Sequence, residues 1–147
     1  MKGWILLVDK NFFPTMNSVK ELSKCVKNRI GIYAYNRNTT DPRNIIRSTY
    51  SQTLSDKNCN GCTGTCEYVD IFGVTLVELM AKITDISTVK LFVTSVDSDG
   101  KLTDPLEGNL STLKFIFHTG IISVSVLTED GEKVYTRKVM RELLNQI

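Results

Sequence analysis

The chain has 147 residues, 41% of them hydrophobic and 23% charged, and a formal net charge of +2. These values exclude an intrinsically disordered chain, and we expect one globular domain over residues 1–147 with a core that needs no disulfide bonds. The apolar run 4–8 is shorter than a signal peptide requires, and no run approaches the roughly 20 apolar residues of a membrane span, so we expect a soluble cytoplasmic protein without a membrane partner.

Two short strands and a helix are predicted near the N-terminus. The apolar run 4–8 suits a buried strand, and β-forming side chains alternate over 30–35 and predict a second strand. Between them, apolar residues recur at helical spacing and predict a helix over 17–28. That helix would carry Cys25 on its buried face.

A second helix is predicted over 42–55. Asp41 and Pro42 are typical of a helix start, because proline is tolerated at the first helical position, and apolar residues follow at helical spacing. Such a helix would place Arg43 and Arg47, four residues apart, on one face. Beyond it, the sequence predicts a loop over 55–65, a strand over 68–72 and a helix over 75–84.

The C-terminal third is predicted to form a β-meander followed by a helix. Asp130 and Gly131 are a strong hairpin signal, and apolar residues at helical spacing predict a closing helix over 138–147. The expected strands cover 89–96, 113–118, 121–127 and 133–136. Together, these patterns predict an α+β fold in which about four helices accompany a mixed or antiparallel sheet.

A cysteine cluster is the most distinctive segment of the chain. Its glycines allow the backbone to fold back, so three thiolates could converge on one tetrahedral zinc ion, which needs a fourth ligand. The predicted zinc ligands are Cys25, Cys59, Cys62 and Cys66, with His118 or Asp56 as alternatives to Cys25. Two other interpretations remain open: incidental loop cysteines beside a buried Cys25, or a Cys59–Cys66 disulfide if the protein is exported.

Positive charge is concentrated in the N-terminal half. Residues 1–66 carry ten Lys or Arg against four Asp or Glu, whereas residues 67–147 carry eight against twelve. Guanidinium groups bind phosphates and aromatic rings stack on unpaired bases, so the segment 24–57 could bind a nucleotide, a nucleic acid or an acidic partner. An ordinary solvated helix face is the alternative. The predicted ligand-binding residues are Arg37, Arg43, Arg47 and Tyr50.

These observations favour a regulatory or binding protein over an enzyme, with the cysteine loop as a local zinc staple. The first alternative is a protein-interaction module or homodimer that pairs through an exposed sheet edge or its terminal helix, without nucleic acid. The second is a small thiol-dependent enzyme in which His118, expected on a strand, activates a cysteine. The sequence contains none of the common glycine-rich phosphate-binding or nucleophile motifs.

Overall fold

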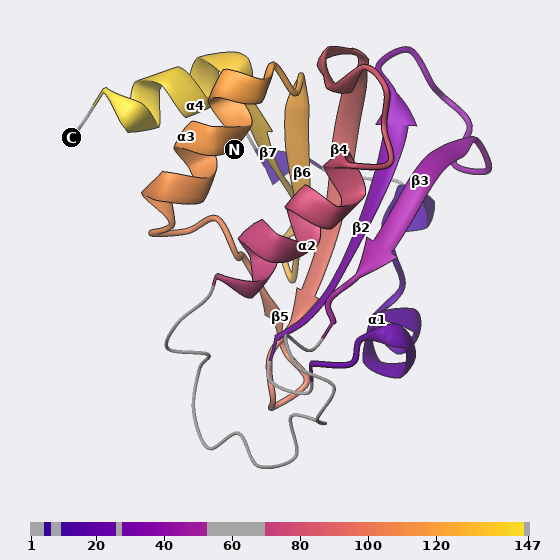
Figure 1. Cartoon of the computed structure of the whole chain (residues 1–147). Coiled ribbons are helices and arrows are strands. Elements are labelled where there is room, and N and C mark those ends of the chain that lie inside the picture. Colours follow the sequence, from indigo (N-terminus) through magenta and orange to yellow (C-terminus); the bar gives the residue numbers. More distant parts are fainter. Residues whose placement is uncertain (1–4, 7–9, 26–27, 53–69, 146–147) are drawn as a thin grey trace.

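The structure, a computed structural model, describes residues 5–6, 10–25, 28–52 and 70–145 (Figure 1). These residues form an α+β fold with a mixed sheet, as the sequence predicts. The elements are β1 (Ile5–Leu6), the 3-10 helix η1 (Lys10–Phe12), α1 (Met16–Leu22), β2 (Arg29–Asn36), β3 (Ile45–Tyr50), α2 (Ile71–Met80), the 3-10 helix η3 (Ile86–Thr88), β4 (Val89–Val96), β5 (Leu102–Thr103), α3 (Leu110–Thr119), β6 (Ser123–Thr128), β7 (Gly131–Thr136) and α4 (Arg137–Leu144).

The sheet has the strand order β1-β7-β6-β4-β2-β3, and β5 pairs with the end of β4. Only β4 and β6 run parallel among the paired strands that the structure describes, and α3 lies in the connection between them. Parallel neighbours require such a crossover, whereas antiparallel neighbours such as β6 and β7 need only a turn. In this order β4 has three strands on one side and two on the other, so it lies near the centre of the sheet, and nearly all its residues are buried.

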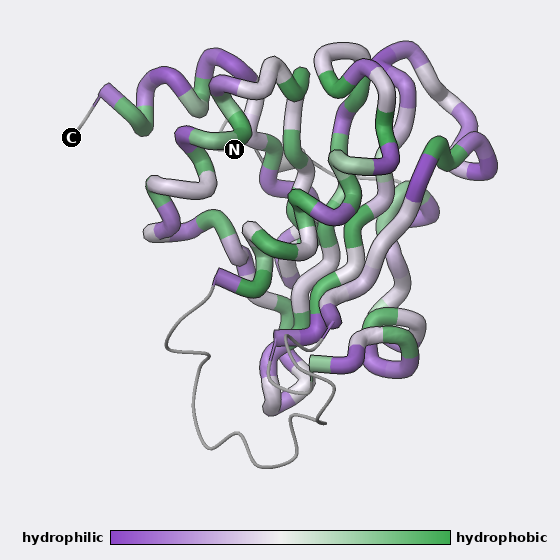
Figure 2. Tube along the Cα trace, in the orientation of Figure 1, coloured by the Kyte–Doolittle hydropathy of each residue, from purple (hydrophilic) through white to green (hydrophobic). Residues whose placement is uncertain are grey.

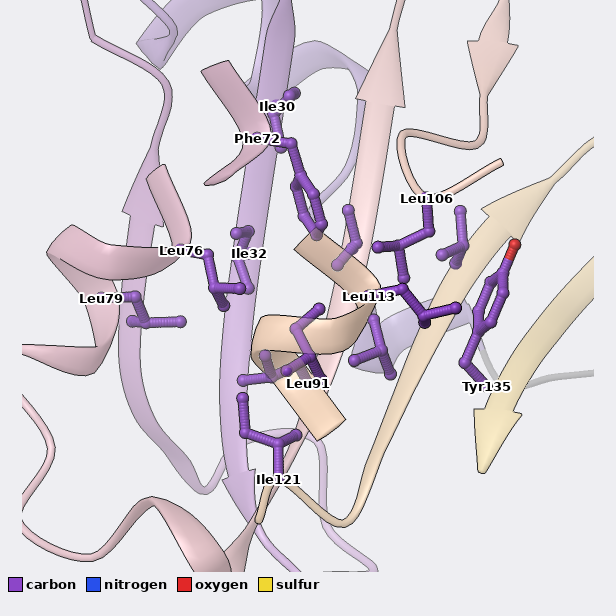
Figure 3. Close-up of a cluster of buried hydrophobic side chains, with 14 of the residues drawn as sticks. Ile30, Ile32, Phe72, Leu76, Leu79, Leu91, Leu106, Leu113, Ile121 and Tyr135 are labelled. Atoms are coloured by element: carbon purple, nitrogen blue, oxygen red, sulfur yellow. The ribbon is translucent and has the colours of Figure 1, made fainter. Parts of the chain in front are cut away.

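Helices cover both faces of the sheet unequally. On one face, α2, α3 and α4 form the larger core with the sheet, in which α2 packs on β2 and α4 packs on β7; part of this core is shown in Figure 3. On the other face, η1 and the residues after it bring Phe12 and Phe13 against a smaller aromatic cluster. Alternate β2 residues enter the two cores because successive strand side chains point to opposite faces.

The predicted helix over 42–55 is wrong where the structure describes it. Residues 45–50 form β3, which pairs with β2 in a hairpin. Asp41 does begin a local structure, since its carboxylate accepts the Arg43 N–H at 2.9 Å, but the chain then extends instead of coiling. Pairing with β2 supplies the hydrogen bonds of this segment, and Arg43 and Arg47 are therefore not neighbours on a helix face.

The predicted strand over 113–118 is also wrong, because these residues belong to α3. The Asn109 side chain accepts the Thr112 N–H at the start of this helix, and Gly120 ends it with a φ of 88°. Leu113 and Ile116, three residues apart, are buried. A helix here forms the crossover that the parallel β4–β6 pair needs.

The remaining elements differ from the predictions mainly at their ends. The first helix stops at Leu22, so Cys25 lies beyond α1, although it is buried as expected. Residues 71–72 begin α2 and are not part of a strand, and the loop predicted over 55–65 falls outside the described residues. The hairpin signal before Gly131 is confirmed, since Thr128 pairs with Gly131 between β6 and β7. No helix in the described ranges has the length and apolar character needed to cross a bilayer.

Candidate functional site

All four residues predicted to bind a ligand lie on the β2–β3 hairpin. Arg37 follows β2 directly, Arg43 lies in the connecting loop, and Arg47 lies in β3. The hydrophilic colour of this loop stands out in Figure 2. We call residues 37–48 the basic hairpin, and its arginines are all exposed.

The loop of the basic hairpin is attached to the rest of the fold by backbone contacts. The Arg37 N–H donates to the Thr88 carbonyl at 2.8 Å, and the Lys90 ammonium donates to the Thr39 carbonyl at 3.0 Å. The Arg37 guanidinium makes no hydrogen bond or ion pair with any other residue in the described part of the chain. The backbone is thus held while this charge faces solvent.

Arg43 is held by its neighbour Asp41. Its guanidinium donates to both carboxylate oxygens, with an Nη2 to Oδ2 distance of 2.9 Å, and its side chain is 88% exposed. Hydrogen bonds from the Arg43 side chain and backbone lower the pKa of Asp41. An exposed pair of this kind adds little stability, so Arg43 can exchange this partner for another carboxylate at small cost.

Arg47 and Tyr50 point to opposite faces of the sheet. Arg47 pairs with Ala34 on the α2 side, where its Nε donates to the Lys82 carbonyl at 3.2 Å. Tyr50 pairs with Gly31 on the other side, and its hydroxyl lies 2.9 Å from that of Tyr33. Burial, followed by the bond to Tyr50, raises the pKa of Tyr33 to about 12. All four residues therefore belong to one hairpin, but Tyr50 lies on the face of the sheet opposite to that of Arg47.

β3 is an edge strand, a feature that the predicted helix concealed. Among the described strands it pairs with β2 alone, and its first four residues are exposed. Ile45 and Ile46 are 38% and 41% exposed, and Ile46 is the extra residue of a β-bulge opposite Ala34 and Tyr35. An edge strand presents unpaired N–H and C=O groups that another chain can pair with.

Three of the four predicted zinc ligands lie outside the described residues. Cys59, Cys62 and Cys66 all fall there, while Cys25 is 1% exposed and its sulfur accepts a hydrogen bond from Asn28 at 3.8 Å. Within 5–6, 10–25, 28–52 and 70–145, no three His, Cys, Asp or Glu side chains are grouped for a metal. The zinc site stays a prediction.

His118 does not occupy the strand position expected of it. It lies exposed in the last turn of α3, with its ring 5.7 Å from that of Phe117. This correction follows from the change of strand to helix over 113–118.

A second candidate site joins Asp104 to Lys133 and Tyr135, two residues of β7 that lie far from it in sequence. Asp104 accepts the Tyr135 hydroxyl at 2.5 Å, the Lys133 ammonium at 2.9 Å and the Leu106 N–H at 2.9 Å. The Asp104 side chain is only 6% exposed. Burial and the bond to Asp104 raise the pKa of Tyr135, which stays neutral. We call Asp104, Lys133 and Tyr135 the buried triad.

Lys133 and Tyr135 of the buried triad line a cavity of about 400 Å³. Apolar side chains of α3, α4 and the preceding loop form most of its wall, and Figure 3 shows Leu106, Leu113 and Tyr135 beside one another. The apolar lining comprises Leu106, Leu110, Leu113, Val139 and Leu143. No local spacing in the sequence links the residues of this site, so no sequence pattern indicates it.

The chain was compared with protein-family models, curated proteins and solved structures. No family model, curated protein or solved structure matches it.

Proposed function

We propose that this protein is a non-catalytic binding protein whose edge strand β3 captures an acidic, extended segment of a protein partner. The observation that carries the proposal is the exposed start of β3, where Ile45 and Ile46 lie between Arg43 and Arg47 on a sheet edge that pairs with no other strand among the described residues. Strand addition gains affinity from main-chain hydrogen bonds, and pockets or charges beside the edge supply selectivity.

The charge of the basic hairpin argues for an acidic segment. Arg37 and Arg47 have no carboxylate partner in the described part of the chain, and the only described ion pair of Arg43 is with exposed Asp41. A second copy of this chain would bring like charges together if two β3 strands paired, which disfavours self-association at this edge. Carboxylates spaced along a partner strand would complement these arginines instead.

The position of Tyr50 favours a protein over single-stranded nucleic acid. Nucleic-acid sites combine positive charge with aromatic rings on which bases stack. Tyr50 is turned to the face away from Arg47, and its hydroxyl is bonded to Tyr33. The exposed apolar side chains on β3 are isoleucines, which suit contacts with a strand.

The proposal is tested by fluorescence anisotropy with three labelled probes. These are a short peptide of alternating glutamate and valine, the same peptide with lysine for glutamate, and an oligo-dT strand. We expect the acidic peptide to bind and the basic peptide not to bind. Preference for oligo-dT over the acidic peptide would replace this proposal with nucleic-acid binding, and salt would then weaken binding steeply.

Matched charge variants locate the binding surface. We expect Arg43→Glu with Arg47→Glu to weaken acidic-peptide binding by about tenfold, since two charge pairs at an edge contribute roughly 1.4 kcal/mol together. Lys114→Glu with Lys138→Glu makes the same change in net charge on exposed positions of α3 and α4, and should leave binding unchanged. Equal weakening by both pairs would show a general charge effect and refute the role of β3.

A further inference from the structure

The cavity beside the buried triad lies away from β3 and is independent of the proposed function. It is bounded by α3, α4, β7 and the loop that follows β5. At about 400 Å³ it falls within the usual range of small-molecule sites, which are concave, mostly apolar and lined by a few placed polar groups.

The wall of the cavity is built before any ligand arrives. Asp104 accepts the Leu106 N–H through Oδ1 and the Lys133 and Tyr135 donors through Oδ2. These bonds tie the loop that carries Leu106 to β7. A preformed site binds without ordering its own wall, which lowers the entropic cost of binding.

The ionised groups of the cavity leave a negative rim. The Lys133 ammonium is neutralised by Asp104 and lies 5.0 Å from the centre of the Tyr135 ring. Glu107 and Glu142 also line the cavity, and neither makes an ion pair with a described residue. The two carboxylates would attract a cation at the mouth and repel an anion.

We infer that this cavity binds a small molecule with an apolar body and one ammonium group. The apolar body would lie against Leu106, Leu113 and Val139, and the ammonium group would lie between the carboxylates of Glu107 and Glu142. Both ends of the ligand then meet matching chemistry, as a selective pocket requires.

Three compounds of matched shape test the inference: phenethylamine, phenethyl alcohol and hydrocinnamate. Each is titrated into the full-length protein labelled with ¹⁵N, and the amide signals of residues 106–113 and 139–143 are followed. We expect the amine to shift these signals with an affinity about fivefold higher than that of the alcohol, and hydrocinnamate to bind most weakly. Equal binding of the three, strongest binding of hydrocinnamate, or no shift with the amine would overturn the inference.

Two sets of variants separate charge from shape. Glu107→Gln with Glu142→Gln should remove the preference for the amine while alcohol binding stays unchanged. Glu21→Gln with Glu129→Gln, at exposed positions outside the cavity, makes the same charge change and should preserve the preference. Leu110→Trp, at a lining residue that is 40% exposed, should block all binding because the larger ring fills the mouth. A preference kept in the first pair would also overturn the inference.

Discussion

Truncation of Asp104 to alanine is expected to destabilise the fold strongly. The Asp104 side chain is 6% exposed and that of Lys133 is 18% exposed, with 2.9 Å between carboxylate and ammonium. Removing the carboxylate leaves a largely buried cation without this partner and deprives the Tyr135 hydroxyl and the Leu106 N–H of their acceptor. Breaking a buried pair in this way costs about 3–5 kcal/mol, and we expect that loss in the free energy of unfolding.

Urea unfolding followed by circular dichroism measures this loss. Asp99→Ala, at an exposed turn position, is the matched control and should change the free energy of unfolding by less than about 0.5 kcal/mol. A triple variant, Asp104→Leu with Lys133→Met and Tyr135→Phe, should recover more than half of the loss, because an apolar replacement of a buried pair is often neutral. A loss below about 1 kcal/mol in Asp104→Ala would refute the view that the triad is buried and coupled.

Three further predictions concern the packing around Gly31, the stability of the fold at alkaline pH and zinc binding by the cysteine loop. Gly31→Val should destabilise the fold by about 1–3 kcal/mol in urea unfolding, because a Cβ there would lie 2.9 Å from the Tyr50 ring and 3.0 Å from Val19. Burial, more than any other cause, raises the pKa of Tyr135 in the folded state. The neutral phenol therefore contributes fully to the free energy of unfolding below the unfolded pKa of about 10, and this contribution declines at higher pH. In urea unfolding, Tyr135→Phe should show a shallower fall in the free energy of unfolding above that pH than the wild type. Elemental analysis of reduced protein should find near one equivalent of zinc, lost in Cys62→Ser, and a metal-free wild type would leave the cysteine loop without this role.

Strands with many β-forming residues in a local pattern could be predicted from the sequence, but β3 could not. The same apolar positions in 45–50 fit a helical stripe and an edge strand, because a bulge and two exposed isoleucines remove the alternation that marks most strands. The Asp41 side chain adds a local bond that begins helices and turns alike. Only the pairing with β2, a non-local contact, decides between them.

The sequence of α3 contains signals for both ends of a helix, but its β-forming residues favour a strand. Asn109 and Gly120 mark the start and end of this helix, yet the β-forming residues between them predicted a strand. Propensity is weak beside tertiary context, and the crossover between parallel β4 and β6 requires a helix-sized connection.

The candidate sites differ in how far the sequence revealed them. The charge pattern of the sequence indicates Arg37, Arg43 and Arg47, and all three lie on one hairpin. They share that hairpin because β2 pairs with β3, and not because a helix carries them. Asp104 and Tyr135 are 31 residues apart and meet only because the fold brings the residue after β5 to the side chain of a β7 residue, so no motif could indicate them.

The most direct test of the account is hydrogen exchange of the β3 amides with and without the alternating glutamate–valine peptide. Strand addition places partner carbonyls opposite the N–H groups of β3 that face away from β2, its one partner among the described strands, so exchange at residues 45–48 should slow when the peptide is bound and stay unchanged in helix α4. Binding of the peptide without any slowing at 45–48 would contradict the claim that this edge is the site of partner capture.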